Sequence, residues 1–292
     1  MSHAIEGVWS AVLTPVDADL RPDAARALAY YRSLLDDGLH GINLLGTTGE
    51  AMSFSVRDRL ALMETLSRDG FPMERAMVGT GAAALEDCAT LTRAAFDLGF
   101  AAALVMPPFY YRDITDDGVM RFFDALLARA HRDGGKVLLY NFPRMSGITF
   151  HARLTERLLA AFPEAIVGMK DSSNDRALQA ELVGAHPSFA VMPGSEHALV
   201  EYRERGLAGC ISGSVALWVA LARRVFDGRD AEDGRALDAL RASLDGLPMI
   251  PAVRYLVARS RRDDAWERCV PPLAPLDAER RATLDARDLV RA

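Results

Sequence analysis

The feature that most constrains the fold is the alternation of short apolar runs with longer amphipathic runs along most of the chain. Eight short runs are apolar at nearly every position, and each is closed by a glycine, a proline, a polar residue or a charged residue. They span 8–14, 41–46, 76–81, 101–106, 136–141, 166–170, 189–194 and 209–213. Apolar side chains on both faces are typical of parallel strands that are covered on both sides. We therefore expect eight parallel strands.

Stretches with the apolar spacing of helices separate these runs. They span 22–36, 55–67, 85–98, 116–130, 154–162, 175–185, 196–205 and 215–226, and the second begins with the capping pattern Ser55 followed by Asp58. Strand–helix units of about 25 residues match a closed (β/α)8 barrel, the TIM barrel. An open doubly wound sheet is the rival fold, but no Gly-x-Gly-x-x-Gly turn follows the first strand.

After residue 227 the alternation stops. The segments 231–244, 250–259 and 277–290 have the patterns of three further helices. We therefore expect an α/β protein in which residues 1–227 form the catalytic barrel and residues 228–292 form a C-terminal helical appendage.

Composition and charge exclude several classes of function. The formal net charge of −6 gives no basic footprint for nucleic acid or for an anionic membrane. No uncharged stretch is long enough to span a bilayer, and the first residues lack the pattern of a signal peptide. Three scattered cysteines favour a reducing compartment, so we expect a cytoplasmic protein. The histidines and cysteines lack ligand spacing, so no metal and no cofactor are expected.

Lysine is scarce, and this scarcity draws attention to one residue. Only Lys136 and Lys170 among the 34 basic residues are lysines. Lys170 ends the sixth predicted strand, where barrel enzymes place their chemistry, whereas Lys136 opens the fifth strand at the opposite end. A partly desolvated lysine can attack a carbonyl group and form a Schiff base, which arginine cannot do. The alternative is a lysine that only pairs with a carboxylate such as Asp171.

Two further strand ends carry reactive or binding groups. Tyr140 closes the fifth strand, where a phenol can transfer a proton, although a tyrosine of the core is an equal alternative. The segment 46–50, Gly-Thr-Thr-Gly-Glu, follows the second strand. Its glycines, hydroxyls and N–H groups suit a small carboxylate, but an ordinary turn with a helix cap remains the alternative.

The remaining strand ends are less specific. The loop 109–112, Phe-Tyr-Tyr-Arg, follows the fourth strand and is suited to covering a site, to an interface or to simple packing. Gly194 and Ser195 end the seventh strand, and Ile211 lies in the eighth, whose turn is able to bind an anion or merely to reverse the chain.

Taken together, these motifs resemble the dihydrodipicolinate synthase and N-acetylneuraminate lyase family of pyruvate-dependent class I aldolases. The motifs that carry the resemblance are 46–50 (GTTGE), 140–143 (YNFP) with Gly147, 168–171 (GMKD), 194–195 (GS) and 270–277 (VPPLAPLD), in matching order along the chain. The resemblance implies a barrel with a helical appendage, assembled as a homotetramer. It also implies pyruvate or another 2-oxo acid and an aldehyde as small-molecule partners.

The resemblance also implies a role for each matching residue. Lys170 would form the imine with the 2-oxo group. Tyr140 would be the general acid and base. Thr47 and Thr48 would hold the carboxylate beside Gly46, and Thr47 would also join Tyr140 in a proton relay. Tyr110 matches the tyrosine that these enzymes lend across a subunit interface.

Departures from the family patterns bear on the substrate. In the synthases, an arginine two residues after the proline of the tyrosine motif binds the carboxylate of the aldehyde. Here that position is Met145, and the arginine is one residue earlier, at Arg144. Ser195 and Glu196 stand where the sialate lyases have an Asp-Glu pair, and Gly213 replaces a serine of those lyases. This pattern is more similar to the 2-keto-3-deoxy sugar-acid aldolases.

Four functions therefore remain open. The first is cleavage of a 2-keto-3-deoxy sugar acid to pyruvate and an aldehyde, with Gly194, Ser195, Ile211, Arg144 and Met145 lining the substrate site. The second is dehydration of a sugar acid through the same imine. The third is 4-hydroxy-tetrahydrodipicolinate synthesis from pyruvate and aspartate semialdehyde, with Arg144 as a substitute anchor. The fourth is a pyruvate-binding sensor without catalysis.

Overall fold

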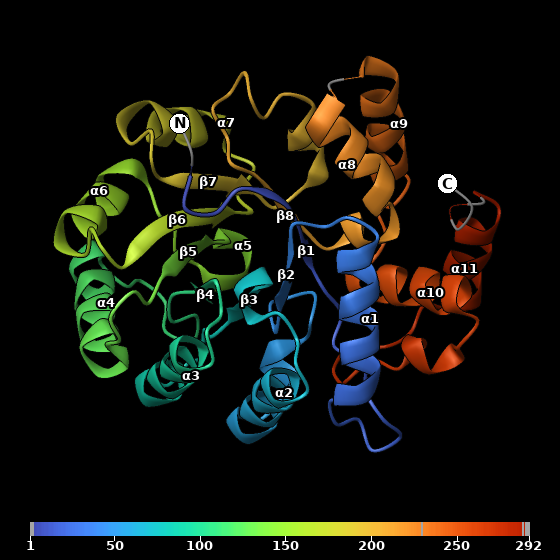
Figure 1. The fold of residues 1–292 in the computed structure, drawn as a ribbon, viewed down its shortest axis with the longest axis horizontal. Helices are drawn as coiled ribbons and strands as arrows, with labels where there is room; N and C mark the ends of the chain where they lie inside the picture. The colour runs from blue at the N-terminus through green and yellow to red at the C-terminus, as the bar shows by residue number, and fades with distance from the viewer. Residues whose placement is uncertain (1–2, 229, 288, 290–292) are drawn as a thin grey trace.

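The fold is a barrel of parallel strands surrounded by helices (Figure 1). A computed structural model describes residues 3–228, 230–287 and 289 of the chain. The strands are β1 (Gly7–Ala11), β2 (Gly41–Leu44), β3 (Ala76–Gly79), β4 (Ala102–Val105), β5 (Val137–Asn141), β6 (Ile166–Asp171), β7 (Ala190–Pro193) and β8 (Gly209–Ser212). They pair in the order β7-β6-β5-β4-β3-β2-β1-β8. The N–H of Ala208 donates to the carbonyl of Val191 at 3.0 Å and links the two ends of the sheet. The predicted barrel is confirmed.

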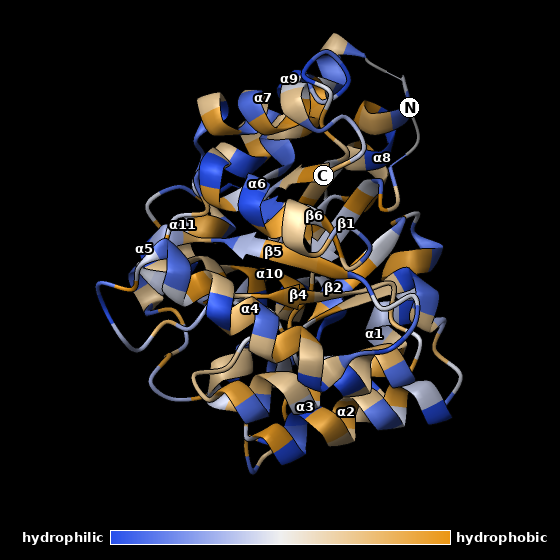
Figure 2. Ribbon diagram, turned by 90° about the vertical axis from the view of Figure 1, so that its left-hand side faces the viewer, coloured by the Kyte–Doolittle hydropathy of each residue, from blue (hydrophilic) through white to orange (hydrophobic). Residues whose placement is uncertain are grey.

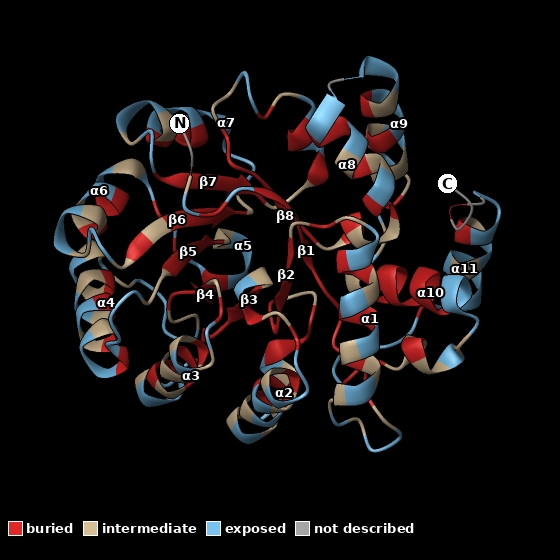
Figure 3. Ribbon diagram, in the orientation of Figure 1, coloured by how far each residue is buried: buried red, intermediate tan, exposed pale blue. Residues whose placement is uncertain are grey.

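Helices surround the strands, and further helices follow the barrel. They are α1 (Ala24–Asp36), α2 (Val56–Arg68), α3 (Leu85–Asp97), α4 (Asp116–Ala130), α5 (Pro143–Ser146), α6 (Ala152–Ala161), α7 (Arg176–Ala185), α8 (Val219–Gly228), α9 (Ala231–Ala242), α10 (Met249–Arg261) and α11 (Ala278–Asp285). Short 3-10 turns are η1 (Ala51–Ser53), η2 (Met73–Arg75), η3 (Glu196–Val200), η4 (Ser214–Leu217) and η5 (Asp264–Glu267). The strands are apolar and buried, and the outer helix faces are polar and exposed, as Figures 2 and 3 show.

Three predicted helices differ from the observed ones. The segment 196–205 is not an α-helix: it forms the short turn η3, because Glu196 points inward and accepts hydrogen bonds from Ser212 and Ser214. The segment 215–226 is interrupted at Trp218, whose φ of −138° lies outside the helical range, so that η4 and α8 are separate. The last helix ends at Asp285, and positions 288 and 290 of the predicted helix lie outside the described residues.

The C-terminal helices α9, α10 and α11 follow the barrel, as predicted. Helix α10 is buried from Pro251 to Ala258 and exposed at its C-terminal end (Figure 3). Leu256 of α10 and Leu34 of α1 belong to one apolar core cluster. The appendage therefore shares its packing with the barrel, and the division at residue 227 stays a prediction.

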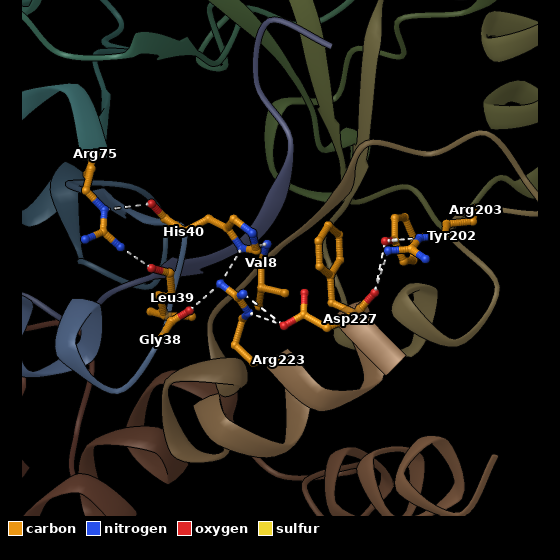
Figure 4. A network of polar contacts seen from close by, with 10 residues as sticks. Val8, Gly38, Leu39, His40, Arg75, Tyr202, Arg203, Arg223 and Asp227 are labelled. Carbon is orange, nitrogen blue, oxygen red and sulfur yellow. Dashed lines mark hydrogen bonds and ion pairs between the residues drawn. The ribbon is translucent and has the colours of Figure 1, made fainter. Parts of the chain in front are cut away.

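A network of polar contacts closes the base of the barrel beside β1 (Figure 4). His40 Nδ1 accepts a hydrogen bond from the N–H of Val8 at 3.0 Å. Arg223 donates to the carbonyl of Gly38 at 2.8 Å and pairs with Asp227 at 2.9 Å. Desolvation and the nearby Arg223 lower the pKa of His40 to about 4, so the ring stays neutral and able to accept this bond.

A membrane-spanning helix and a cluster of metal ligands are both absent from the described part of the chain. No described helix has the length and apolar character needed to cross a membrane. No group of three or more His, Cys, Asp or Glu side chains in the described residues is placed to hold a metal ion.

Candidate active site

A β-bulge places the predicted lysine beside the predicted tyrosine. Val137 of β5 pairs with Ile166 of β6, but the next residue, Leu138, pairs with Gly168, so one residue of β6 is skipped. The shift brings Lys170 opposite Tyr140. Without the bulge the tyrosine would face residue 169, because side chains alternate between the two faces of a strand. The local irregularity is therefore what joins the two groups at the carboxyl ends of the strands.

Lys170 is buried but has no carboxylate partner among the residues that the structure describes. Its side chain is 4% exposed, and Nζ lies 4.6 Å from the centroid of the Tyr140 ring. Asp171, the partner in the alternative interpretation, instead accepts hydrogen bonds from Asn141 at 2.8 Å and from Gln179 at 2.5 Å. Successive strand residues point to opposite faces, which explains why the two neighbours do not pair. Within the described part of the chain, Lys170 is thus a buried amine without a counter-ion.

The tyrosine is connected to the turn after β2. Tyr140 is 4% exposed, and its Oη lies 3.2 Å from Oγ1 of Thr47. Thr48, the next residue, lies against the turn after β8: a Cβ on Gly213 would be 2.7 Å from the Thr48 hydroxyl oxygen. Any larger side chain at position 213 would therefore displace the Thr48 hydroxyl. Thr47 therefore links the turn after β2 to Tyr140, and Thr48 links the same turn to the end of β8.

The turn that carries the threonines is fixed by its neighbours. Leu45 and Glu50 both have positive φ, 51° and 55°, and the N–H of Glu50 bonds to the carbonyl of Thr47 at 3.0 Å. Gly79 of β3 has to be a glycine, since a Cβ there would lie 2.1 Å from the carbonyl oxygen of Leu45. This close approach of β3 seats the turn against the barrel.

Glu50, the last residue of the turn, is anchored to the C-terminal appendage. Its carboxylate accepts from Nε of Arg254 at 2.6 Å and from the N–H of Val270 at 2.9 Å. Arg254 also donates to the carbonyl of Thr14 at 2.8 Å and to that of Trp266 at 3.2 Å. The side chains of Glu50 and Arg254 are 0% and 1% exposed. A buried ion pair therefore ties α10 to the threonine turn.

Three predicted residues lie on the surface and are not joined to the others. Arg144 and Met145 lie in α5 directly after β5, and both are exposed, Met145 at 45%. Tyr110 is 74% exposed in the loop after β4 and packs edge-on against Tyr111. Within one chain, the described contacts do not bring Tyr110 to Tyr140.

The predicted site residues at the ends of β7 and β8 differ in burial and in contacts. Gly194 approaches Ser172 so closely that a Cβ would lie 2.4 Å from its hydroxyl oxygen. The Ser195 hydroxyl is buried without a protein partner among the described residues. Ile211 is fully buried in the cluster that also holds Tyr140, inside the barrel. Glu196, by contrast, is 0% exposed and held by two serine hydroxyls, so it is not free to bind a substrate.

Sequence reasoning did not identify several of these supporting groups. Asp171 organises the loop after β6 through hydrogen bonds with Asn141, Gln179 and Ser173. In the sequence, its position next to Lys170 is the only signal of this role. Arg254 has no local motif, because its partner is 204 positions away in sequence. Asn43 is 0% exposed, and both side-chain polar atoms lack partners among the described residues. The signal for Asn43 in the sequence is a polar residue within an otherwise apolar strand run.

The arrangement is suited to chemistry on a 2-oxo acid. A buried amine without a counter-ion can attack a carbonyl, and a phenol within reach can move protons. The adjacent threonines offer hydroxyl and N–H groups to a carboxylate. Cys210 of β8 does not compete as a nucleophile, because burial raises the pKa of its thiol well above the ordinary value.

The chain is similar to known proteins along nearly its whole length. A family model described as "Dihydrodipicolinate synthetase family" matches residues 4–287. An uncharacterized DapA-like lyase of Chloroflexus aurantiacus is 36% identical over 287 residues, 96% of this chain and 95% of its own length. A 4-hydroxy-tetrahydrodipicolinate synthase of Stenotrophomonas maltophilia is 31% identical, covering 97% and 95%. The crystal structure of dihydrodipicolinate synthase from Agrobacterium tumefaciens superposes with a TM-score of 0.89 at 30% identity, over 96% of this chain and 99% of that one.

Proposed function

The chain belongs to the dihydrodipicolinate synthetase family of Schiff-base, pyruvate-dependent lyases, and we propose that it cleaves a 2-keto-3-deoxy sugar acid to pyruvate and an aldehyde. The observation that carries the proposal is the buried Lys170 amine 4.6 Å from the Tyr140 ring, with the Tyr140 phenol 3.2 Å from Thr47. These three side chains come from β5, β6 and the turn after β2, and together they supply a nucleophile, a proton carrier and a relay.

The first stage forms the imine. The amine of Lys170 adds to C2 of the oxo acid, and the oxygen of that carbon takes the phenolic proton of Tyr140 and leaves as water. Thr47 and Thr48 hold the substrate carboxylate through hydroxyl and N–H groups. The protonated imine then withdraws electrons from the neighbouring carbon, which is what lowers the barrier of the next step.

The second stage breaks the bond between C3 and C4. Tyr140 accepts the proton of the C4 hydroxyl, the C4 oxygen becomes the carbonyl of the leaving aldehyde, and the bonding electrons move into the imine to give an enamine. The same tyrosine returns a proton to C3, and water hydrolyses the imine to release pyruvate. The surroundings suit this sequence because Lys170 and Tyr140 are both 4% exposed.

The sugar-acid substrate is supported by the apolar group at the mouth of the site. Met145 stands at the place where the synthases carry the arginine that holds the aldehyde carboxylate, and a thioether cannot hold a carboxylate. Pyruvate released from a panel of 2-keto-3-deoxy acids is the assay. A retained carbon skeleton would identify the dehydratase instead, and pyruvate binding without any turnover would identify the sensor.

A second candidate function, 4-hydroxy-tetrahydrodipicolinate synthesis, is favoured by one observation. Arg144 is exposed beside the mouth of the site and forms no hydrogen bond or ion pair within the described structure, so its guanidinium is available to an anionic aldehyde. A coupled assay with aspartate semialdehyde tests it. If this candidate is correct, the wild-type chain catalyses the synthesis and Arg144→Gln abolishes it. If the sugar-acid proposal is correct, the wild-type chain shows no synthase activity and Arg144→Gln still cleaves the sugar acid.

The assembly and location of the chain belong to the same proposal. The exposed Tyr110 and Tyr111 are suited to an interface in which Tyr110 reaches the site of a second copy within a homotetramer. Sedimentation equilibrium tests the tetramer, and loss of cleavage in Tyr110→Phe tests its role. Cytoplasmic location follows from the reducing environment that three unpaired cysteines favour.

A further inference from the structure

One buried carboxylate connects the loops that follow β7 and β8. Glu196 is the first residue of η3, directly after Gly194 and Ser195, and it is fully buried. Its carboxylate accepts a hydrogen bond from the Ser214 hydroxyl at 2.6 Å and another from the Ser212 hydroxyl. Strands β7 and β8 lie side by side (Figure 1). The two hydrogen bonds therefore join neighbouring loops at the carboxyl ends of the strands, where barrel enzymes place their chemistry.

The two serines flank the residue on which Thr48 lies. Ser212 and Ser214 stand on either side of Gly213 in the chain. A Cβ on Gly213 would be 2.7 Å from the hydroxyl oxygen of Thr48 and 3.1 Å from its methyl carbon. The φ of Gly213 is −75°, which any residue adopts, so the closeness of Thr48 is what requires a glycine here. The position of this turn therefore sets where the Thr48 hydroxyl lies.

The carboxylate of Glu196 is held without a basic partner. Within the described part of the chain, no arginine, lysine or histidine forms an ion pair with it, and the two serine hydroxyls are its hydrogen-bond partners. The neighbouring His197 pairs with Asp238 instead, at 2.5 Å. A buried charge is costly, and an apolar side chain of similar volume would fill the same space at a lower cost. Packing alone therefore does not explain a glutamate at this position.

We propose that Glu196 is a positioning residue for the carboxylate of the substrate. Its two hydrogen bonds fix the turn around Gly213, and this turn holds the Thr48 hydroxyl where it binds the substrate carboxylate. Because Glu196 is fully buried, it acts through Thr48 and does not itself contact the substrate. The inference rests on the proposed function in one respect, the role of Thr48 in holding the carboxylate of the 2-oxo acid. It does not depend on which sugar acid is cleaved.

Trapping of the pyruvate imine measures this effect on the full chain. The initial rate of labelling at Lys170 by pyruvate and borohydride, followed over a range of pyruvate concentrations, gives the half-saturating concentration. Glu196→Ala should raise this concentration, and the KM for cleavage, about tenfold with a much smaller change in kcat. Glu196→Gln keeps two polar atoms facing the serines and should stay within about threefold of wild type. Glu204→Ala, at an exposed position shortly after η3, is the matched control and should change neither value.

A double-mutant cycle tests whether Glu196 acts through Thr48. Thr48→Val has no hydroxyl to misplace, so adding Glu196→Ala to it should change the half-saturating pyruvate concentration by less than about threefold. Equal effects of Glu196→Ala in the two backgrounds would refute the proposal. A Glu196→Ala chain that unfolds at lower urea concentration but keeps the wild-type half-saturating concentration and KM would also refute it, because Glu196 would then support only the fold.

The same readouts separate this inference from the proposed function. A wild-type chain that is not labelled by pyruvate and borohydride lacks the imine chemistry, and this result overturns both. A wild-type chain that is labelled but cleaves no sugar acid contradicts the proposed function alone, and the labelling rates still decide on Glu196. If Glu196→Ala does not fold, Ser214→Ala takes its place: it removes one of the two hydrogen bonds and should raise the half-saturating concentration about threefold. An unchanged value in Ser214→Ala would then overturn the positioning role.

Discussion

The buried pair of Glu50 and Arg254 is the contact on which the threonine turn depends, and its removal has a predictable cost. In Arg254→Met the apolar stem remains, but the carboxylate of Glu50 keeps only the N–H of Val270 as a donor. The carbonyls of Thr14 and Trp266 lose their donors as well. Removal of one member of a buried pair typically costs about 3–5 kcal/mol, because it leaves an uncompensated buried charge.

The double-mutant cycle separates this charge effect from simple loss of packing. Glu50→Gln removes the charge from the other side, and Arg254→Met with Glu50→Gln leaves no buried ion. We expect the double variant to be less destabilised than the sum of the single variants by about 2 kcal/mol, since groups in contact couple by roughly 0.5–3 kcal/mol. Arg259→Met on the same helix is the matched control, because Arg259 is exposed and lies 3.9 Å from its acid, Asp285.

Equilibrium unfolding in urea measures the cycle, with the slope checked for two-state behaviour. The turn gives a second readout: the apparent affinity for pyruvate should fall in Arg254→Met and stay unchanged in Arg259→Met, because Glu50 ends the segment that carries Thr47 and Thr48. Additive unfolding energies, or an Arg254→Met protein with the stability and pyruvate affinity of wild type, would refute the anchoring role.

Further predictions concern the site and the base of the barrel. Tyr140→Phe keeps the ring over Lys170 but removes the phenol, so kcat should fall by about 10²–10⁴-fold while the pyruvate imine still forms; an unchanged kcat would exclude Tyr140 as the proton carrier. Thr48→Val should raise KM for the oxo acid about tenfold or more with a smaller change in kcat, and steady-state kinetics would contradict the carboxylate role if only kcat changed. The pKa of His40 is lowered from 6.5 to about 4, so the unfolded chain binds more protons than the folded chain between these pH values. The free energy of unfolding therefore falls as the pH is lowered through this window, by about 1–2 kcal/mol after allowance for the partial exposure of His40. Urea unfolding midpoints measured between about pH 7 and pH 5 check this prediction. His40→Asn should make the midpoint less dependent on pH, and an unchanged pH dependence would assign the effect to other groups.

Much of the fold was predictable because the strand and helix periods are local. The runs that end at Tyr140 and Lys170 were placed to within one residue, and these positions alone put both groups at one end of the barrel. The β-bulge that sets them opposite each other was not visible, since the skipped residue, Val167, is as apolar as its neighbours. The α-helix predicted over 196–205 was wrong because tertiary hydrogen bonds to Glu196 override its helical pattern.

The supporting contacts of the site were the least predictable part. Lys170 could be selected because lysine is scarce, but the exclusion of Asp171 as its partner needed the geometry of Gln179 and Asn141. Glu50 was seen only as the end of a turn, and its partner Arg254 lies on a helix of the appendage. Sequence spacing carries no information on such distant pairs, which depend on how the appendage docks on the barrel.

The central claim is that Lys170 forms an imine with a 2-oxo acid, and reductive trapping tests it most directly. The enzyme is incubated with pyruvate and borohydride, and peptide mass spectrometry locates the product. We expect one carboxyethyl group on the wild-type chain, on the peptide that contains Lys170, with Lys136 unmodified and no addition to Lys170→Ala. A wild-type chain that gains no group, or gains it at Lys136, would contradict the account.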